Sequence, residues 1–289
     1  MRAGLAVALA LWAGGARAEA PLWTFGDADT QVTVLGSVHA LPPGVPWRGP
    51  AVDRAIAQAD VVVFEMRQGA PPAAVREAHA LMAELGRARD GVALSDRLSA
   101  AGRERLARHA PAVGLAPGTL DGLQPWYVGF QLEWAGGRRD GARPELGVEA
   151  VVLAALRPEQ RTEALEEPTD IVRILSGFPM ADQVRMLEGL LEGLDAPDTL
   201  RRNARALEAA WAAGRTEAIA AESARLRAAS PGVHARLVTE RNRRWADQLT
   251  RLLDRPGRVL VVVGAGHMVG TEGLPALLRS RGVAVSGPR

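Results

Sequence analysis

The sequence predicts an α/β fold in which a mixed or mostly parallel sheet is formed from the two ends of the chain. Three short runs of mostly β-branched residues support this prediction, at residues 31–35 and 59–64 near the N-terminus and at 258–263 near the C-terminus. Such runs are typical of parallel strands that are buried on both faces. From about residue 72 to about residue 254, apolar residues recur at spacings of three and four, which predicts a large helical insertion.

The N-terminal strands enclose a short helix. Gln31–Leu35 (QVTVL) and Ala59–Phe64 (ADVVVF) are the expected strands, and Ala51–Gln58 between them has the spacing of a helix. A helix that connects two parallel strands forms a β-α-β unit. The first part of the chain is therefore predicted to be such a unit.

The middle of the chain is predicted to be mainly helical, and its clearest helices are Met180–Leu194 and Val233–Leu253. Thr162–Glu166 is a candidate for another strand of the sheet. Prolines and glycines between the apolar segments, as at Pro256-Gly257, indicate turns.

The C-terminal part of the chain contains the most apolar strand, Arg258–Val263 (RVLVVV). We expect a glycine-rich turn after it, then a helix of about ten residues from Glu272 and a short last strand at Val283–Val285. Both Gln31–Leu35 and Arg258–Val263 are too apolar for the edge of a sheet, so each needs two neighbouring strands. Because few strands are available, these two are expected to lie close together.

Residues 1–18 have the pattern of a secretory signal peptide. A basic start at Met1-Arg2 precedes an apolar run, Leu5–Trp12, and Ala16-Arg17-Ala18 has small residues where an export peptidase reads them. The apolar run is too short to span a bilayer permanently. We therefore expect cleavage after Ala18, no stable membrane insertion, and an exported protein, periplasmic or secreted, with a single domain over residues 19–289.

The composition excludes several classes of site. The 289 residues include no cysteine, and all 35 basic residues are arginine. A disulfide framework, a thiol nucleophile, Cys-ligated zinc and a Schiff-base lysine are therefore excluded. The 33 acidic residues are interspersed with the arginines and no basic stripe is present, so no nucleic-acid partner is expected.

One short motif, Gly-x-x-His, occurs twice, at Gly36–His39 and at Gly264–His267. Each copy directly follows a predicted strand, and Glu65 directly follows the third one. The carboxyl ends of parallel strands form the ligand crevice of an open sheet, so these side chains are expected to meet there. Two imidazoles and one carboxylate suit a catalytic divalent metal whose bound water acts as the nucleophile.

Other interpretations of these residues stay open at this level. A histidine in a turn after a strand is commonly a hydrogen-bonded structural residue. Gly264–Gly270 is rich in glycine like a phosphate-binding loop, but it lacks the P-loop lysine and the dinucleotide spacing. Arg67 either faces the crevice or pairs with Glu65, and the aromatic stretch Leu123–Trp134 is expected in the core. Three further histidines are expected on the surface: His79, His109 and His234.

Together with several further segments, these motifs resemble the TraB/GumN family, whose animal relatives include the TIKI proteins. The segments occur in the family order and span nearly the whole chain after residue 18. They are Leu123–Val128 (LQPWYV), Gly147–Glu149 (GVE), Leu165-Glu166, Gln183 within PMADQVRML, Glu240–Trp245 (ERNRRW) and Val263–Gly270 (VGAGHMVG).

The resemblance implies an α/β core shared with erythromycin-esterase-like and ChaN-like proteins. For the TIKI branch it implies metal-dependent proteolysis, with manganese or cobalt as the ion. His39 and His267 match the paired histidines of the family, and Glu65 matches its acidic residue after the second strand. Arg241-Asn242 matches an Arg-Asn pair of the family.

Two positions depart from the family pattern. Glu149 stands where many members have aspartate, which moves a carboxylate by one methylene and makes this residue a less certain ligand. Glu167-Pro168 stands where members often have threonine and a small polar residue. These departures concern the surroundings of the paired motifs and not the motifs themselves.

From the sequence we expect an exported metal-dependent hydrolase that cleaves a peptide bond of a peptide or protein substrate. His39, Glu65 and His267 are expected to hold a divalent metal (manganese, cobalt or zinc) or to activate its water. Arg241 and Asn242 are expected to stabilise the developing oxyanion. Two other functions stay open: a haem- or metal-binding envelope protein without turnover, with an imidazole as axial ligand, and a non-catalytic protein that needs the motif for folding.

Overall fold

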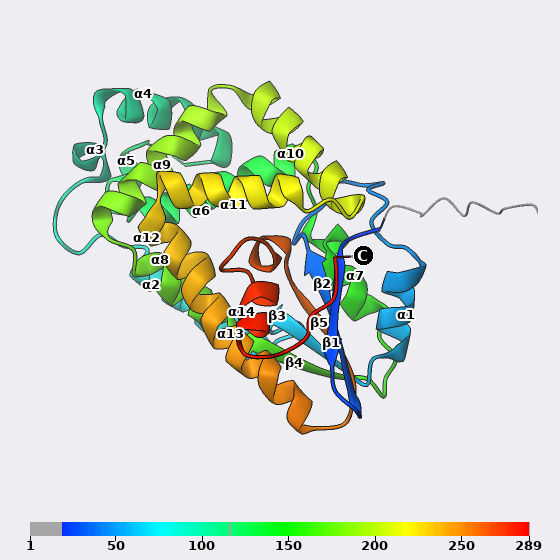
Figure 1. Cartoon of the computed structure of the whole chain (residues 1–289). Coiled ribbons are helices and arrows are strands. Elements are labelled where there is room, and N and C mark those ends of the chain that lie inside the picture. The colour runs from blue at the N-terminus through cyan, green and yellow to red at the C-terminus, as the bar shows by residue number, and fades with distance from the viewer. Residues whose placement is uncertain (1–18, 116, 289) are drawn as a thin grey trace, which may run out of the picture.

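A computed structural model describes residues 19–115 and 117–288, and the predicted signal peptide, residues 1–18, lies outside them. At the centre of the described residues is a five-stranded sheet with the order β1-β2-β5-β3-β4 (Figure 1). The last strand of the chain therefore lies between two strands of its N-terminal part. The strands are β1 (Leu22–Gly26), β2 (Thr30–Ser37), β3 (Val61–Met66), β4 (Arg161–Glu166) and β5 (Gly257–Gly264).

The strands β2 and β5 are neighbours inside the sheet, as predicted from their apolar sequences. β1 pairs with β2 in antiparallel orientation, whereas the pairs β2–β5, β5–β3 and β3–β4 are parallel. The register places Ser37 opposite Gly264 and Phe64 opposite Val262. These three strands therefore end at the same edge of the sheet, where His39 and His267 follow β2 and β5 and Glu65 is the second-last residue of β3.

The strand β1 was not part of the sequence prediction. Its segment, LWTFG, is short and becomes a strand by pairing along its whole length with β2. The backbone N–H of Asp27 donates a hydrogen bond to the carbonyl of Thr30 (3.0 Å), which closes the tight turn between the two strands. The pairing partner, and not the composition of the segment, therefore produces this strand.

The prediction of a last strand at Val283–Val285 is wrong. Beside this segment the structure has only an isolated bridge between Thr24 and Ser286. The chain reaches Pro288 two residues later, and proline has no N–H with which to continue a ladder. The preceding helix, α14 (Leu274–Ser280), is also shorter than expected.

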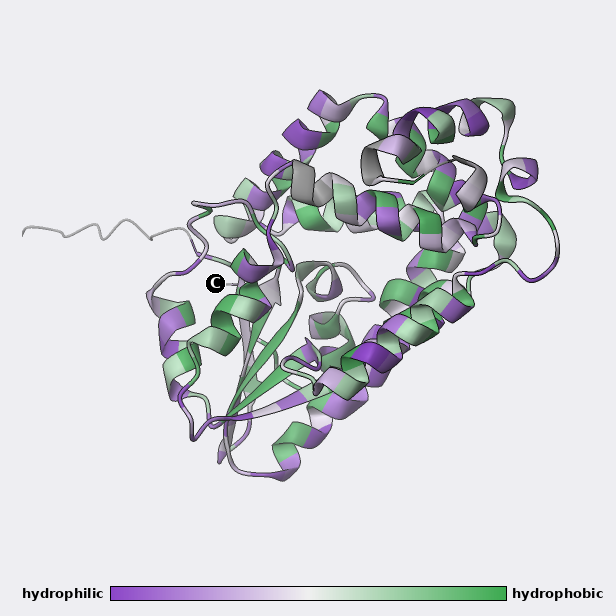
Figure 2. Cartoon of the chain, turned by 180° about the vertical axis from the view of Figure 1, so that it is seen from behind, coloured by the Kyte–Doolittle hydropathy of each residue, from purple (hydrophilic) through white to green (hydrophobic). Residues whose placement is uncertain are grey.

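Helices cover both faces of the sheet. Along β5, Val262 contacts one helical layer, whereas its neighbours Val261 and Val263 contact the other, as the alternation of a strand requires. Figure 2 shows the strands as mainly hydrophobic between these layers. The first layer contains α1 (Pro50–Gln58), α7 (Val148–Ala154), α10 (Pro197–Ala212) and α11 (Glu217–Ala229), and the second contains α13 (Glu240–Thr250) and α14.

The predicted insertion is mainly helical and has its own core, in which Leu106, Val128 and Leu187 are buried together. It also supplies β4, so the candidate strand at Thr162–Glu166 is confirmed. None of the helices in the described residues is long and apolar enough to cross a membrane. The remaining helices of the insertion are α2 (Pro72–Leu85), α3 (Leu94–Arg97), α4 (Ala100–His109), α5 (Pro117–Leu120), α6 (Pro125–Arg139), α8 (Pro168–Ser176) and α9 (Met180–Leu194).

The predicted helix Val233–Leu253 is continuous but not uniform. α12 (Pro231–His234) leads into a π-helical turn, Ala235–Thr239, which is followed by α13 and a 3-10 turn. A π turn contains one residue more per hydrogen-bonded ring than an α turn, so it rotates the residues after it relative to those before it. The π turn therefore sets the direction in which Arg241, near the start of α13, points.

Glu19, the first residue after the expected cleavage point, contacts the N-terminus of α1. Its Oε2 accepts hydrogen bonds from the backbone N–H groups of Ala51 (3.1 Å) and Val52 (3.4 Å). The N-cap residue of this helix is Gly49, which has no side chain of its own for capping. The carboxylate of Glu19 therefore takes the role of a helix cap.

Candidate functional site

The strand ends bring His39, Glu65 and His267 to one space, as the sequence predicts. A β-carbon placed on Gly264 would lie 3.2 Å from Glu65 Oε2, 3.5 Å from His267 Cδ2 and 3.6 Å from His39 Nε2. All three side chains therefore surround Gly264, although more than two hundred residues separate the two histidines. Glycine at this position leaves open the space that any other side chain would fill.

Asn242 fixes the proton position on His267. Its amide nitrogen donates hydrogen bonds to the carbonyls of His267 (3.2 Å) and Glu272 (2.8 Å). The amide oxygen is therefore the acceptor that lies 2.6 Å from Nδ1 of His267, so this nitrogen carries the proton. Nε2 of His267 is left with a lone pair. Burial disfavours the charged ring and lowers the pKa of His267 to about 4, so the imidazole is neutral near pH 7.

His39 is held in the same way by a carboxylate. Its Nδ1 lies 2.8 Å from Glu149 Oε1, which also accepts a hydrogen bond from the hydroxyl of Ser37 (2.5 Å). Burial opposes protonation of His39, but the hydrogen bond and negative charge of Glu149 outweigh it and raise the pKa of the imidazole to about 9. The His39 side chain is 64% exposed, so solvent screens this attraction. Nε2 of His39 faces the space beside Gly264.

Glu65 is buried and fully hydrogen-bonded. Its Oε1 accepts from Arg241 Nη2 (2.7 Å), and its Oε2 accepts from the backbone N–H of Gly264 (2.7 Å). Burial alone would raise the pKa of Glu65, but the two imidazoles, Arg241 and the Gly264 N–H outweigh it and lower this pKa to about 2. Glu65 is therefore a carboxylate throughout the physiological range.

Arg241 joins these groups from the other side. Its guanidinium donates to Glu166 (2.8 Å from Nη2 to Oε2) as well as to Glu65, and Nη1 lies 3.2 Å from Nε2 of His267. The guanidinium carbon also lies 4.5 Å from the ring centre of Trp245, at cation–π distance. Two buried carboxylates and one aromatic ring thus hold a single buried cation beside the histidines.

The structure places Arg241 and Asn242 differently relative to the shared space. Arg241 reaches it with Nη1 and Nη2, next to His267 and Glu65. Asn242 is completely buried behind His267, and both its amide groups are bonded to the protein. In this arrangement Asn242 positions the imidazole and does not itself face the shared space.

The donor chemistry fits a divalent metal, but the described side chains do not form a ready cage. Within residues 19–115 and 117–288, no group of three or more His, Asp or Glu residues lies close enough to hold an ion. Glu65 Oε1 and His267 Nε2 are 3.9 Å apart, and Arg241 contacts both atoms. Two imidazoles and one carboxylate are nevertheless a donor set that such metals accept, once His39 has lost its Nε2 proton. A metal held by His39, Glu65 and His267 therefore requires Arg241 to withdraw from Nε2 of His267.

A cavity opens beside the two imidazoles, with a volume of about 570 Å³. Its lining contains His39 and His267 together with apolar side chains of α10 and α11, such as Leu207, Trp211 and Leu226. This size is in the range of pockets that bind small molecules or one part of a larger substrate.

A comparison with protein families assigns the chain to one of them. The sequence model of the TraB/PrgY/gumN family matches residues 21–287, which is nearly the whole chain. The chain belongs to the TraB/PrgY/gumN family. Searches among curated proteins and among solved structures gave no match.

The sequence analysis of this TraB/PrgY/gumN protein assigned no role to Glu166, which is buried against Arg241. The signal for it was nevertheless present. Glu166 ends the candidate strand β4 and is paired in register with Met66, next to Glu65. Applied to this strand, the rule that ligand groups follow the carboxyl ends of parallel strands would have added Glu166 to the site.

Three expectations for the TraB/PrgY/gumN chain outside its strand ends need correction. His234 is buried and not on the surface, and it bonds to Ser223 Oγ (3.2 Å from Nε2). Arg67 faces neither the crevice nor Glu65, because it pairs with Glu167. Trp134, expected in the core with its aromatic neighbours, is 51% exposed. For the two helical residues, His234 and Trp134, the difference arises because periodicity gives the face of a helix but not the element that packs against it. For Arg67 it arises because Glu167, which follows the neighbouring strand β4, lies within reach.

Proposed function

We propose that this TraB/PrgY/gumN protein is an exported metal-dependent hydrolase that cleaves a peptide bond. One observation carries the proposal: both Gly-x-x-His imidazoles and Glu65 converge on one space, and each imidazole is anchored through Nδ1. A histidine anchored in this way presents Nε2 in a fixed direction, to a metal or to a water molecule. Hydrolysis of a peptide bond, as opposed to another bond, rests on the resemblance to the TIKI proteins.

The residues would share the chemistry as follows. His39, Glu65 and His267 would hold the ion, manganese, cobalt or zinc, which when bound supplies a water molecule of lowered pKa. The carboxylate of Glu149 would orient the neutral imidazole of His39 and strengthen it as a ligand, because its Oε1 lies 2.8 Å from Nδ1. Arg241 would stabilise negative charge on the substrate carbonyl oxygen with the Nη1–H group that it turns away from Nε2 of His267 when the ion binds.

The first test is made on the chain from Glu19 onward, purified without chelator. Elemental analysis is expected to find a divalent metal near one ion per chain, and a peptide library is expected to be cleaved faster with added manganese or cobalt than with chelator. His39→Ala and His267→Ala are each expected to lower the rate by about a hundredfold or more, the scale for losing a preorganised catalytic group. His79→Ala, on the exposed face of α2, is the matched control and should leave the rate unchanged.

The double variant His39→Ala/His267→Ala should be hardly slower than either single variant, because residues that act as a unit are not additive. Cleavage at the normal rate by both single variants would show that the proposed site is not the active site. Cleavage that is indifferent to chelator and metal would leave a hydrolase but remove the metal from it.

The apolar cavity beside the imidazoles favours one second function, a haem-binding protein without turnover. A porphyrin needs an apolar slot next to an axial imidazole, and Trp211 and Leu226 lie opposite His39 and His267. Titration with haem would then give a Soret band that shifts in His39→Ala or His267→Ala. If the spectrum stays that of unbound haem with the unaltered protein and with both variants, haem binding is excluded.

A further inference from the structure

We propose that the substrate is bound through two bulky apolar side chains, one on each side of the cleaved bond, in two cavities that flank His39. This proposal rests on the proposed hydrolase function and names its substrate class. The Trp211 cavity is the one beside both imidazoles, lined by Leu207, Trp211, Ile219, Leu226 and Val238. The Trp134 cavity also borders His39 and is lined by Ala40, Phe130, Trp134, Ala142 and Pro144.

The Trp211 cavity is a preformed apolar site of about 570 Å³. Trp211 is 1% exposed, and its Nε1–H donates to the carbonyl of Gly36 (2.7 Å). The indole is therefore locked by the same strand end that carries the His39 motif, and its polar atom is already satisfied. The apolar surface that stays accessible in this cavity comes from the half-buried Leu207, Leu226 and Val238, which matches a leucine or phenylalanine side chain.

The Trp134 cavity, of about 370 Å³, exposes an aromatic ring that packing alone does not require. Trp134 is 51% exposed, and its ring stacks on Phe130 with centres 6.5 Å apart and planes inclined by 14°. Both stacked rings line the cavity. A rigid exposed tryptophan beside a candidate catalytic histidine is typical of a binding surface.

A single residue, His39, lines both cavities, so a bond held at His39 has apolar space on either side. A third cavity of about 290 Å³ shares Glu133 and Ala142 with the Trp134 cavity and Ala204 and Glu208 with the Trp211 cavity. This third cavity therefore borders both of the others and gives an extended chain room along α6 and α10. A compact single-ring ligand would use only one of them.

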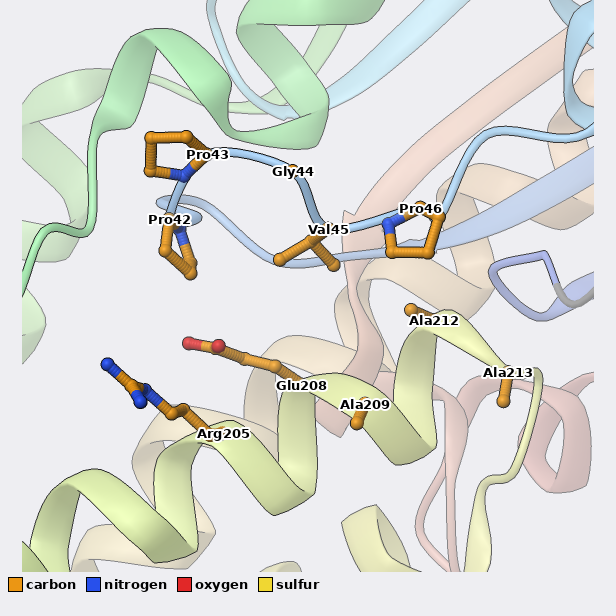
Figure 3. Close-up of a pocket in the computed structure, with 10 residues that line it drawn as sticks. All are labelled: Pro42, Pro43, Gly44, Val45, Pro46, Arg205, Glu208, Ala209, Ala212 and Ala213. Atoms are coloured by element: carbon orange, nitrogen blue, oxygen red, sulfur yellow. The ribbon is translucent and has the colours of Figure 1, made fainter.

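The loop that follows His39 bounds this region on its outer side. Pro42–Pro46 crosses α10, and Glu208 extends from the helix into the space of about 440 Å³ between them (Figure 3). Apart from the imidazoles, the charged side chains described on the two cavity walls are carboxylates: Glu133, Glu208 and Glu222. Acidic residues next to the cleaved bond should therefore be disfavoured, because like charges in a partly buried site repel.

The test uses internally quenched peptides with alanine at the other positions. The parent has a bulky apolar residue, leucine or phenylalanine, on each side of the cleaved bond, and its derivatives carry glycine or aspartate on one side or the other. Trp134→Ala is expected to lower kcat/KM for the parent by about tenfold or more. It should have little effect on the glycine peptide that lacks the bulky residue bound in the Trp134 cavity. Ala204→Trp fills the Trp211 cavity from an exposed position of α10. It should lower kcat/KM for the parent likewise, and have little effect on the other glycine peptide, which lacks the residue bound in the Trp211 cavity.

Val75→Ala is the matched control, because Val75 is 39% exposed on α2 and lines neither cavity. Ala204→Leu serves as the second filling variant, and circular dichroism checks that each variant is folded. Equal rates for the parent and for both glycine peptides would overturn the two-cavity proposal and leave the hydrolase proposal intact.

Binding separates this proposal from the failure of catalysis. The amide N-acetyl-phenylalaninamide is titrated into the unaltered protein and into both cavity variants, with tryptophan fluorescence or calorimetry as readout. If no peptide is cleaved, the hydrolase proposal fails. Weaker binding of the amide by Trp134→Ala and Ala204→Trp, but not by Val75→Ala, would still support the two cavities as binding sites for apolar side chains. Binding that is equal in all four proteins would overturn them.

Discussion

Asn242 is the residue that decides which nitrogen of His267 carries the proton. Its amide can face only one way, because its nitrogen donates to two backbone carbonyls. The oxygen must then accept from Nδ1, so Nε2 keeps its lone pair in the shared space. Glu149 does the same for His39, but as a carboxylate it also favours the charged ring. The two motif histidines are therefore alike in sequence and opposite in the direction of their pKa shifts.

Changing Asn242 to aspartate should remove this difference. In metal-free Asn242→Asp, a negative charge next to Nδ1 favours the imidazolium, so the pKa of His267 is expected to rise from its value of about 4. NMR titration of the imidazole signals measures this shift. Asn203→Asp, the same change at an exposed position of α10, is the control and should leave that signal where it is. An unchanged His267 titration in Asn242→Asp would mean that Asn242 does not set the protonation of the ring.

Among the elements, β4 contributes more to the site than an edge strand usually does. Its last residue, Glu166, accepts hydrogen bonds from Arg241 and from the indole N–H of Trp245 (3.1 Å). Glu163 on the same strand pairs with Arg255 at the surface. The two carboxylates differ in burial, since the side chain of Glu166 is 7% exposed and that of Glu163 is 38% exposed.

These two glutamates provide a matched comparison of a buried and an exposed ion pair. Glu166→Gln is expected to lower the free energy of unfolding by about 3 kcal/mol, because it leaves part of a buried guanidinium charge without its partner. Glu163→Gln should lower it by about 0.5 kcal/mol, since solvent screens an exposed pair. Urea denaturation measures both values. Equal losses in the two variants would contradict the structural role assigned to Glu166.

The short helix α12 carries His234, whose burial makes stability depend on pH. Burial lowers the pKa of His234 below its ordinary 6.5, although the charge of Glu272 opposes this. The unfolded chain therefore takes up a proton at this residue as the pH falls below about 6.5, while the folded chain resists it. The stability contributed by the neutral ring is thus present above this pH and is lost below it.

His234→Gln should accordingly lose less free energy of unfolding between pH 7 and pH 5 than the unaltered protein does. The measurement is thermal or urea unfolding of both proteins at several pH values, with the values above pH 7 as the internal reference. A difference between the two proteins that does not change with pH would show that the imidazole does not titrate in this range when the chain unfolds.

The sequence predicted most of the elements but not all of the contacts that make the site. Apolar runs were sufficient for β2, β3 and β5, because short runs of β-branched residues are typical of strands buried on both faces. Spacing was sufficient for α9, whose bounds agree with the prediction. The π turn at Ala235–Thr239 leaves no comparable signal, yet it directs Arg241 toward Glu65 and Glu166. Partners on other elements, such as Glu149 for His39, follow from packing and not from local sequence.

For the molecule as a whole, the residue after the expected cleavage point is bonded to the fold. Glu19 caps α1 through the backbone N–H groups of Ala51 and Val52. N-terminal sequencing of protein from a soluble envelope fraction is therefore expected to return Glu19. Glu19→Ala should lower the free energy of unfolding by about 1 kcal/mol through the lost cap. Recovery of chains that start at Met1, or only from the cytoplasm, would contradict the prediction of export.

The position of β5 also determines when the protein can fold during its synthesis. β2 and β3 both pair with β5, and only β1 and β4 are available to them from earlier parts of the chain. Until the ribosome has added residues 257–264, the nascent chain lacks the centre of its sheet and the strand that joins its two halves. Contacts of such long sequence separation form slowly, so we expect the sheet to close late in translation, after the core of the helical insertion has been synthesised. Under the proposed export, a translocation channel that accepts only unfolded polypeptide would meet the chain before its sheet has closed.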